Sequence, residues 1–150
     1  IDSILRVFPD AKFVFLVRDP LETLPSYFSL QENVKFGNLL SDKEIKLLRK
    51  ETYAEVIEWY KETEKVKSKL LKKQFMVLTY PQITTDIQNS IKSFYKFTNM
   101  KMTKNFEKEV KVFASRKYVK KHQNKSIEDY GFSKKQVLRD FDFVYQEYFL

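Results

Sequence analysis

Arg18 and Ser26 are the residues of this chain whose types and spacing best suit the binding of an anion. Arg18 follows the apolar run 13–17 and precedes Asp19-Pro20, and Ser26 comes eight positions after the arginine. A guanidinium offers a fixed fork of donors, and a serine offers a hydroxyl. The N-terminus of a helix beginning near Asp19 would add free N–H groups. Together these groups predict a phosphate site.

The elements around Arg18 would bring it to the edge of a sheet. Residues 12–17 predict a strand, and its continuous apolar run predicts burial on both faces. Asp19 is a good N-cap, Pro20 suits the first helical position, and Glu22 lies where a capping box needs a glutamate. Ligands of open α/β folds bind at the carboxyl ends of the strands, where this arginine would lie.

The rest of the chain predicts helices around one further strand. Residues 1–8 read as the end of a helix, and residues 75–78 as the second strand. Helices are predicted after Ser41, Asp86 and Ser133, with a short one near 106–112, while 30–41 reads as irregular. The helix after Ser41 would run to about residue 72 and allows a break near 51–52. Two apolar strands joined through helices predict a parallel pair with a right-handed crossover, and we expect further strands outside this sequence.

Composition excludes several kinds of site. The 150 residues predict one domain with a real core, because 43% of them are hydrophobic. With only Gly37 and Gly131, the chain cannot hold a Walker-type phosphate loop. It has no cysteine and a single histidine, which excludes disulfides, thiol nucleophiles and multi-histidine metal sites. No apolar stretch approaches the roughly 20 residues that span a bilayer.

The net charge of +8 has two readings. It can describe a solvated lysine-rich surface, or a field that attracts an anionic ligand. Nucleic acid is also anionic, so charge alone does not choose between a nucleotide and a polymer.

Residues 9–29 resemble the 3′-phosphate-binding segment of the sulfotransferases that use 3′-phosphoadenosine-5′-phosphosulfate (PAPS). The family pattern is an apolar strand, then Arg-(Asp/Asn)-Pro, then a helix with a serine eight positions past the arginine, as at Arg18 and Ser26. Residues 75–83 are similar to the next strand of the family. Tyr80 matches the family's tyrosine, which lies near the nucleotide, whereas Pro81-Gln82 replaces two acidic residues. Residues 115–133 are similar to a basic, histidine-containing stretch of some bacterial-type members.

The resemblance implies a fold and a set of binding residues. The fold would be part of a P-loop-NTPase-like, three-layer α/β domain, with parallel strands, flanking helices and the strand of the phosphate loop missing. Residues 1–150 would form a single partial domain, with the phosphosulfate loop and the catalytic base upstream of Ile1. His122 is an alternative candidate for the base. The residues expected to bind the nucleotide are Arg18, Ser26, Tyr80, Arg116, Lys121 and His122.

The resemblance also implies transfer of a sulfuryl group from PAPS to an acceptor hydroxyl or amine, without a metal. The acceptor could be a carbohydrate, a lipid, a small alcohol or a protein tyrosine, and the isolated 150-residue chain is expected to be inactive. Bacterial-type members are cytoplasmic, whereas Golgi members have an N-terminal anchor. Two alternatives are another P-loop-like nucleotide enzyme, such as a kinase, and a non-catalytic basic module for nucleic acid or acidic partners, although nucleic acid is the less expected ligand.

Each candidate residue also has a plain structural reading. Arg18 could pair with Asp19 or with a helix C-terminus, and Ser26 could be a surface hydroxyl. Tyr80 could be a core residue at a strand end, and the basic loop could simply be solvated. Pro25 lies in the second turn of the helix, where it should bend the helix and re-aim Ser26.

Overall fold

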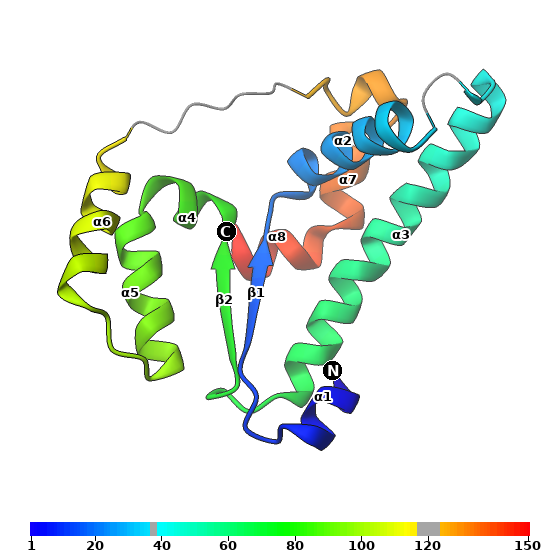
Figure 1. Cartoon of the computed structure of the whole chain (residues 1–150). Helices are drawn as coiled ribbons and strands as arrows, with labels where there is room; N and C mark the ends of the chain where they lie inside the picture. The colour runs from blue at the N-terminus through cyan, green and yellow to red at the C-terminus, as the bar shows by residue number, and fades with distance from the viewer. Residues whose placement is uncertain (37–38, 117–123) are drawn as a thin grey trace. The chain divides into compact units, whose positions relative to one another are not determined.

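The computed structural model describes residues 1–36, 39–116 and 124–150 (Figure 1). It is a mixed α/β structure with two parallel strands and flanking helices. The chain divides into two compact units. The first contains Ile1–Val17 and Lys65–Lys120, and the second contains Arg18–Glu64 and Lys121–Leu150.

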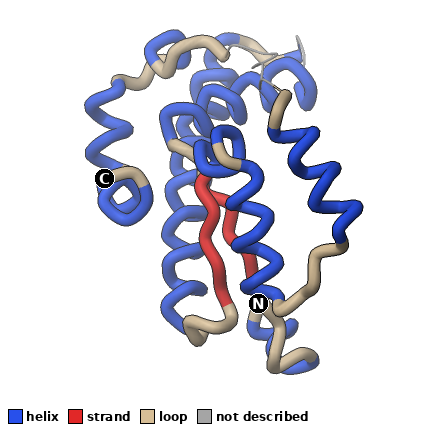
Figure 2. Tube along the Cα trace, turned by 90° about the vertical axis from the view of Figure 1, so that its left-hand side faces the viewer, coloured by secondary structure: helices blue, strands red, loops and turns tan. Residues whose placement is uncertain are grey.

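The sheet of the first unit pairs β1 (Phe13–Val17) with β2 (Phe75–Thr79). The strands run side by side (Figure 2). They are parallel, with Val17 opposite Thr79 at their carboxyl ends, which confirms the predicted pairing. The prediction that β1 is buried on both faces is wrong for this chain. Val14 and Leu16 are 40% and 60% exposed, whereas the alternate residues Phe13, Phe15 and Val17 are half-buried or buried. Side chains alternate between the two faces of a strand, so only one face of β1 is covered.

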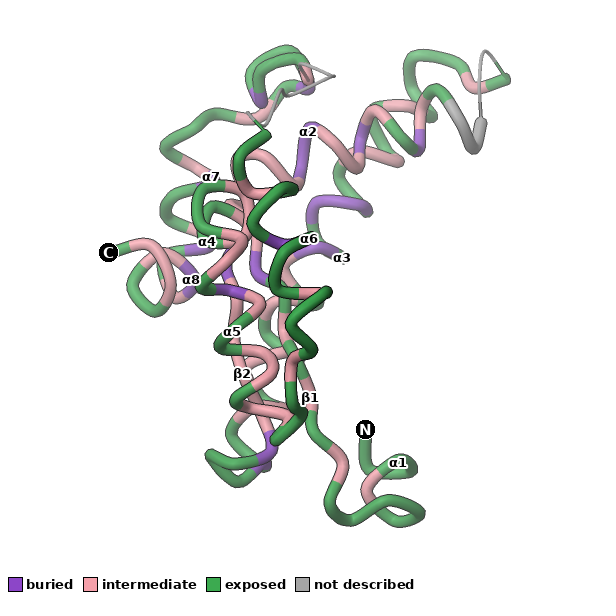
Figure 3. The backbone as a smooth tube through the Cα atoms, turned by 60° about the vertical axis from the view of Figure 1, so that its left-hand side comes forward, coloured by how far each residue is buried: buried purple, intermediate pink, exposed green. Residues whose placement is uncertain are grey.

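The helices of the first unit begin at side-chain caps. Thr79 and Gln82 form a reciprocal capping box, and Asp86 and Thr103 each accept a bond from a backbone N–H three residues on. The helix after Thr79 was not predicted, although its capping box is visible in the sequence. The first helix of the chain, α1, is largely exposed (Figure 3). The helices of this unit are α1 (Asp2–Val7), α4 (Tyr80–Thr85), α5 (Ile87–Thr98) and α6 (Lys104–Ala114).

The second unit consists of helices. The predicted cap at Ser41 is confirmed by its reciprocal bonds with Glu44, and the long helix that follows is continuous through residues 51–52. A π-helix occupies 31–36, which was predicted to be irregular, and the last predicted helix is divided in two at Phe141. The elements are α2 (Pro20–Leu30), η1 (Gln31–Phe36), α3 (Asp42–Lys69, ending in the first unit), η3 (Glu128–Tyr130), α7 (Lys134–Asp140) and α8 (Asp142–Tyr148).

An aromatic stack forms the core of the second unit. Phe28 of α2 stacks on Phe132 at a centroid distance of 5.5 Å, and Phe132 stacks on Tyr53 of α3 at 4.5 Å. Gly131, with φ of 87°, supplies the left-handed residue that the turn before Phe132 requires. Phe141 is fully buried and meets the edges of Tyr53 and Tyr60. These contacts join α2 and α3 to the C-terminal helices.

Candidate functional site

Arg18 is the first residue after β1, as predicted. Its side chain is 28% exposed, and its Nε and Nη2 atoms each lie 3.2 Å from Oε2 of Glu22. Glu22 was expected to complete a capping box, but the structure pairs it with the arginine one helical turn earlier. The guanidinium therefore already has an oxyanion, a carboxylate, beside it. A phosphate oxygen would make the same kind of contact.

The expectation of free N–H groups at the start of α2 is wrong. Pro20 has no N–H, and the N–H of Leu21 donates to Oδ1 of Asp19 at 2.8 Å. The N–H groups of Glu22 and Thr23 both donate to the Asp19 carbonyl, at 2.9 and 2.8 Å. Asp19 thus satisfies the first turn of the helix by itself, so the N–H groups of this turn are not free to bind an anion.

Two tyrosine hydroxyls hold the segment between β1 and α2. The hydroxyl of Tyr60, from α3, donates to the Arg18 carbonyl at 2.6 Å and lies 3.1 Å from Oγ1 of Thr23. The hydroxyl of Tyr145, from α8, lies 2.6 Å from Oδ1 of Asp19 and donates to it. Burial raises the pKa of both hydroxyls, and the Asp19 carboxylate raises that of Tyr145 further. Both tyrosines therefore remain neutral donors at ordinary pH.

Ser26 lies about two turns into α2 and is half-buried. Among the described residues its hydroxyl has no hydrogen-bond partner, so it is available to a ligand. Pro25 beside it is buried inside the helix, and α2 continues beyond it to Leu30. Ser26 therefore stays on the same helix that Arg18 precedes.

The other predicted residues lie elsewhere in the chain. Tyr80 is the half-buried first residue of α4 and comes directly after Thr79, the register partner of Val17. Arg116 is exposed just after α6, with its guanidinium 6.0 Å from the ring of Phe113. Lys121 and His122 are outside the described residues. Arg18 and Ser26 belong to the second unit, and Tyr80 and Arg116 to the first, so their joint action stays a prediction.

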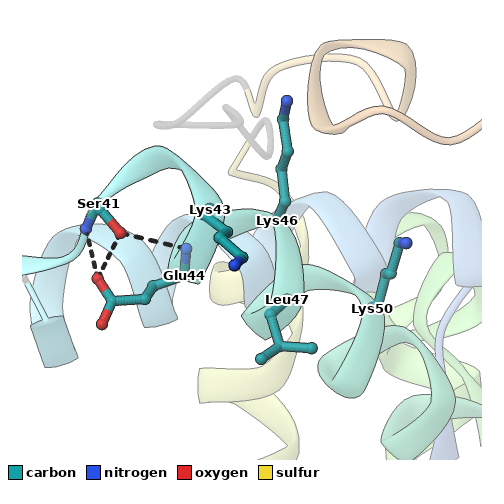
Figure 4. A pocket seen from close by; sticks show the side chains of 6 residues that line it. All are labelled: Ser41, Lys43, Glu44, Lys46, Leu47 and Lys50. Carbon is teal, nitrogen blue, oxygen red and sulfur yellow. Dashed lines mark hydrogen bonds between the residues drawn. The ribbon is translucent and has the colours of Figure 1, made fainter.

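A hollow lies beside the first turns of α3 (Figure 4). Its lining contains the capping pair Ser41 and Glu44, and none of the predicted phosphate-binding residues. The lysines around it come from successive turns of one helix, so it is an open basic surface rather than an enclosed cavity. The lining residues are Ser41, Lys43, Glu44, Lys46, Leu47 and Lys50.

Sequence reasoning missed the roles of Tyr60 and Tyr145. Both fit the apolar faces of their predicted helices, where a tyrosine reads as a core residue. The available signal was the hydroxyl, because a buried tyrosine usually finds a hydrogen-bond partner for it. The partners could not be inferred, since they lie 42 and 126 residues away in the chain.

No described helix is both long and apolar enough to cross a membrane.

No curated protein matches the sequence significantly. Among solved structures, the sulfotransferase STF9 from Mycobacterium avium has the same fold, with a TM-score of 0.74 at 18% identity. The alignment covers 99% of this chain and 39% of that protein, so the chain spans about two-fifths of the length of its structural relative. The sequence model of the sulfotransferase family matches residues 1–104, and the chain therefore belongs to the sulfotransferase family.

Proposed function

We propose that this chain forms the 3′-phosphate-binding part of a sulfotransferase that uses PAPS. The observation on which the proposal rests is the placement of Arg18 directly after β1, with a guanidinium that is partly exposed. Membership of the sulfotransferase family supports the class of reaction. When bound, PAPS would supply the sulfuryl group that passes to an acceptor hydroxyl or amine.

Arg18 and Ser26 are the side chains that would hold the 3′-phosphate. The guanidinium would donate to two phosphate oxygens, and the Ser26 hydroxyl, which has no partner among the described residues, would donate to a third. Glu22 would have to share Arg18 with the phosphate or turn away from it. Tyr80, Arg116, Lys121 and His122 complete the proposed set, in the roles that the family resemblance implies. The resemblance to bacterial-type members supports a cytoplasmic enzyme, and its acceptor would be a carbohydrate, a lipid or a small alcohol.

The test compares two nucleotides that differ only in the 3′-phosphate. Calorimetric titration of the full-length protein with 3′-phosphoadenosine-5′-phosphate and with AMP gives the ratio of their dissociation constants. We expect Arg18→Ala to reduce the preference for the 3′-phosphate by roughly 10-fold to 100-fold, the value of a charge-assisted hydrogen-bond pair. Arg139→Ala is the matched control, because Arg139 is 75% exposed and pairs with Asp140.

Two results would overturn the proposal. One is equal affinity of the native protein for the two nucleotides. The other is a preference that survives Arg18→Ala unchanged. Binding of a single-stranded RNA whose affinity falls steeply with salt, without preference for the 3′-phosphate, would instead support a basic binding module.

A further inference from the structure

We propose that Tyr60 and Tyr145 are positioning residues, whose hydroxyls hold the Arg18 carbonyl and the Asp19 carboxylate and thereby set where the Arg18 guanidinium meets the 3′-phosphate. This inference rests on the proposed function of Arg18. It assigns the discrimination between nucleotides partly to two side chains that would not touch the nucleotide.

Tyr60 holds the backbone of the arginine itself. Its hydroxyl donates to the Arg18 carbonyl at 2.6 Å. The first intrahelical bonds of α2 use the carbonyl of Asp19, so the carbonyl of Arg18 lies one residue before this helical ladder. Tyr60 therefore supplies, from another helix, a bond that α2 does not provide.

Thr23 links the two sides of this arrangement. Its Oγ1 donates to the Asp19 carbonyl at 3.0 Å and lies 3.1 Å from the Tyr60 hydroxyl. The Tyr60 hydroxyl thus contacts both Arg18, two residues before α2, and Thr23 in the first turn of α2. Such a bridge restricts the angle at which the helix leaves Arg18.

Tyr145 holds the next residue. Its hydroxyl donates to Oδ1 of Asp19, and the same oxygen accepts the N–H of Leu21. The carboxylate that caps α2 is therefore also tied to α8. Together, Tyr60 holds the backbone carbonyl of Arg18 and Tyr145 holds the side chain of the next residue, which restricts the position of Arg18.

The tyrosine rings are themselves anchored by aromatic neighbours. The ring of Tyr60 meets Phe141 edge to face at 5.5 Å, and Phe141 is fully buried. The ring of Tyr145 lies 5.9 Å from that of Phe149. Precise placement matters at Arg18, because displacement of a binding group by about 1 Å can cost much of its effect.

The experiment uses Tyr60→Phe and Tyr145→Phe, with Tyr53→Phe as the matched control. The hydroxyl of Tyr53 donates to Oδ2 of Asp140 at 3.0 Å, so the control also loses a tyrosine–carboxylate bond in the same unit. Titration of each full-length variant with 3′-phosphoadenosine-5′-phosphate and AMP gives its preference for the 3′-phosphate. We expect a loss of roughly 3-fold to 10-fold in the two test variants, the value of one hydrogen bond, and no change in the control.

The outcomes separate this inference from the proposed function. If Arg18→Ala abolishes the preference while Tyr60→Phe and Tyr145→Phe retain it, the positioning role is wrong and the function stands. If Arg18→Ala retains it, the function is wrong and the positioning role with it. An equal loss in Tyr53→Phe would indicate a general effect on packing and would overturn the positioning role.

A further variant covers the case in which a phenylalanine variant does not fold. Thr23→Val keeps both tyrosines and removes only the bridging hydroxyl. A reduced preference for the 3′-phosphate in this variant would support the positioning role, and an unchanged preference would overturn the part of it assigned to Thr23.

Discussion

The guanidinium of Arg18 and the carboxylate of Glu22 lie 3.2 Å apart across one helical turn. The same guanidinium is the proposed ligand of a phosphate, so Glu22 both shields the arginine and competes with its proposed substrate. A negative charge at this distance also repels an incoming phosphate directly.

Glu22→Gln should therefore strengthen nucleotide binding. Removing the negative charge beside Arg18 is expected to lower the dissociation constant for 3′-phosphoadenosine-5′-phosphate by roughly 3-fold to 10-fold at low salt, and by less at high salt. Calorimetric titration at two salt concentrations measures both effects. Glu58→Gln is the control, since Glu58 pairs with Lys61 on an exposed face of α3. Weaker binding by Glu22→Gln would contradict the competition.

Arg49→Lys should destabilise the second unit. Arg49 donates to both carboxylate oxygens of Glu32, at 2.5 and 2.9 Å, and the two side chains are only 22% and 17% exposed. Its guanidinium also lies 5.1 Å from the ring centre of Tyr130. Lysine cannot reproduce the two parallel bonds, so we expect a loss of about 1 kcal/mol in the free energy of unfolding.

Urea denaturation of Arg49→Lys measures this loss. Arg139→Lys should remain within about 0.5 kcal/mol of the native protein, because Arg139 is largely exposed. Equal stability of Arg49→Lys and the native protein would show that the pair contributes nothing beyond its charge.

The protein should lose stability in alkali. Burial raises the pKa of Tyr53, Tyr60 and Tyr145, and carboxylates raise those of Tyr53 and Tyr145 further. A tyrosine whose folded pKa lies above its unfolded value of about 10 stabilises the fold fully below that pH and loses its contribution as pH rises. Unfolding free energies from circular dichroism between pH 8 and about pH 11 should therefore fall, and less steeply in the double variant Tyr53→Phe/Tyr145→Phe. If the unfolding free energies of the native protein and the double variant fall equally steeply with pH, these hydroxyls are not the cause of the loss of stability.

Phe28→Ala should be among the most damaging substitutions in the second unit. Phe28 is 1% exposed and contacts the rings of Tyr130 and Phe132. Loss of the ring leaves a cavity and is expected to cost about 3–5 kcal/mol of the free energy of unfolding. Denaturation by urea, with Phe113→Ala as the exposed control, tests this value, because Phe113 is 60% exposed.

Most of the features that the sequence predicted correctly are local. The caps at Asp19, Ser41 and Ser133 each depend on a side chain and a backbone N–H two or three residues away, so their sequence signatures are nearly sufficient. The strands were recognised from their apolar runs, and their parallel pairing followed from the helices between them. The placement of Arg18 at a strand end followed from the same runs.

The features that the sequence did not predict depend on distant partners or on competition between local ones. The sequence pattern favoured a capping box in which Glu22 pairs with Asp19, whereas in the structure Glu22 pairs with Arg18. Val14 and Leu16 are as apolar as a doubly buried strand requires, yet burial depends on what covers each face. The hydrogen bonds of Tyr60 and Tyr145 join separate helices, and no local pattern encodes such bonds.

The parallel pairing of β1 with β2 has a consequence for the order of folding. The two strands cannot meet until the chain between them, which includes the 28 residues of α3, has closed a loop of about sixty residues. Contacts of such high sequence separation slow folding, whereas a helix can form from its own local bonds. The pairing of β1, the strand that precedes Arg18, would therefore be among the last parts of the fold to form, after the helices on either side of it.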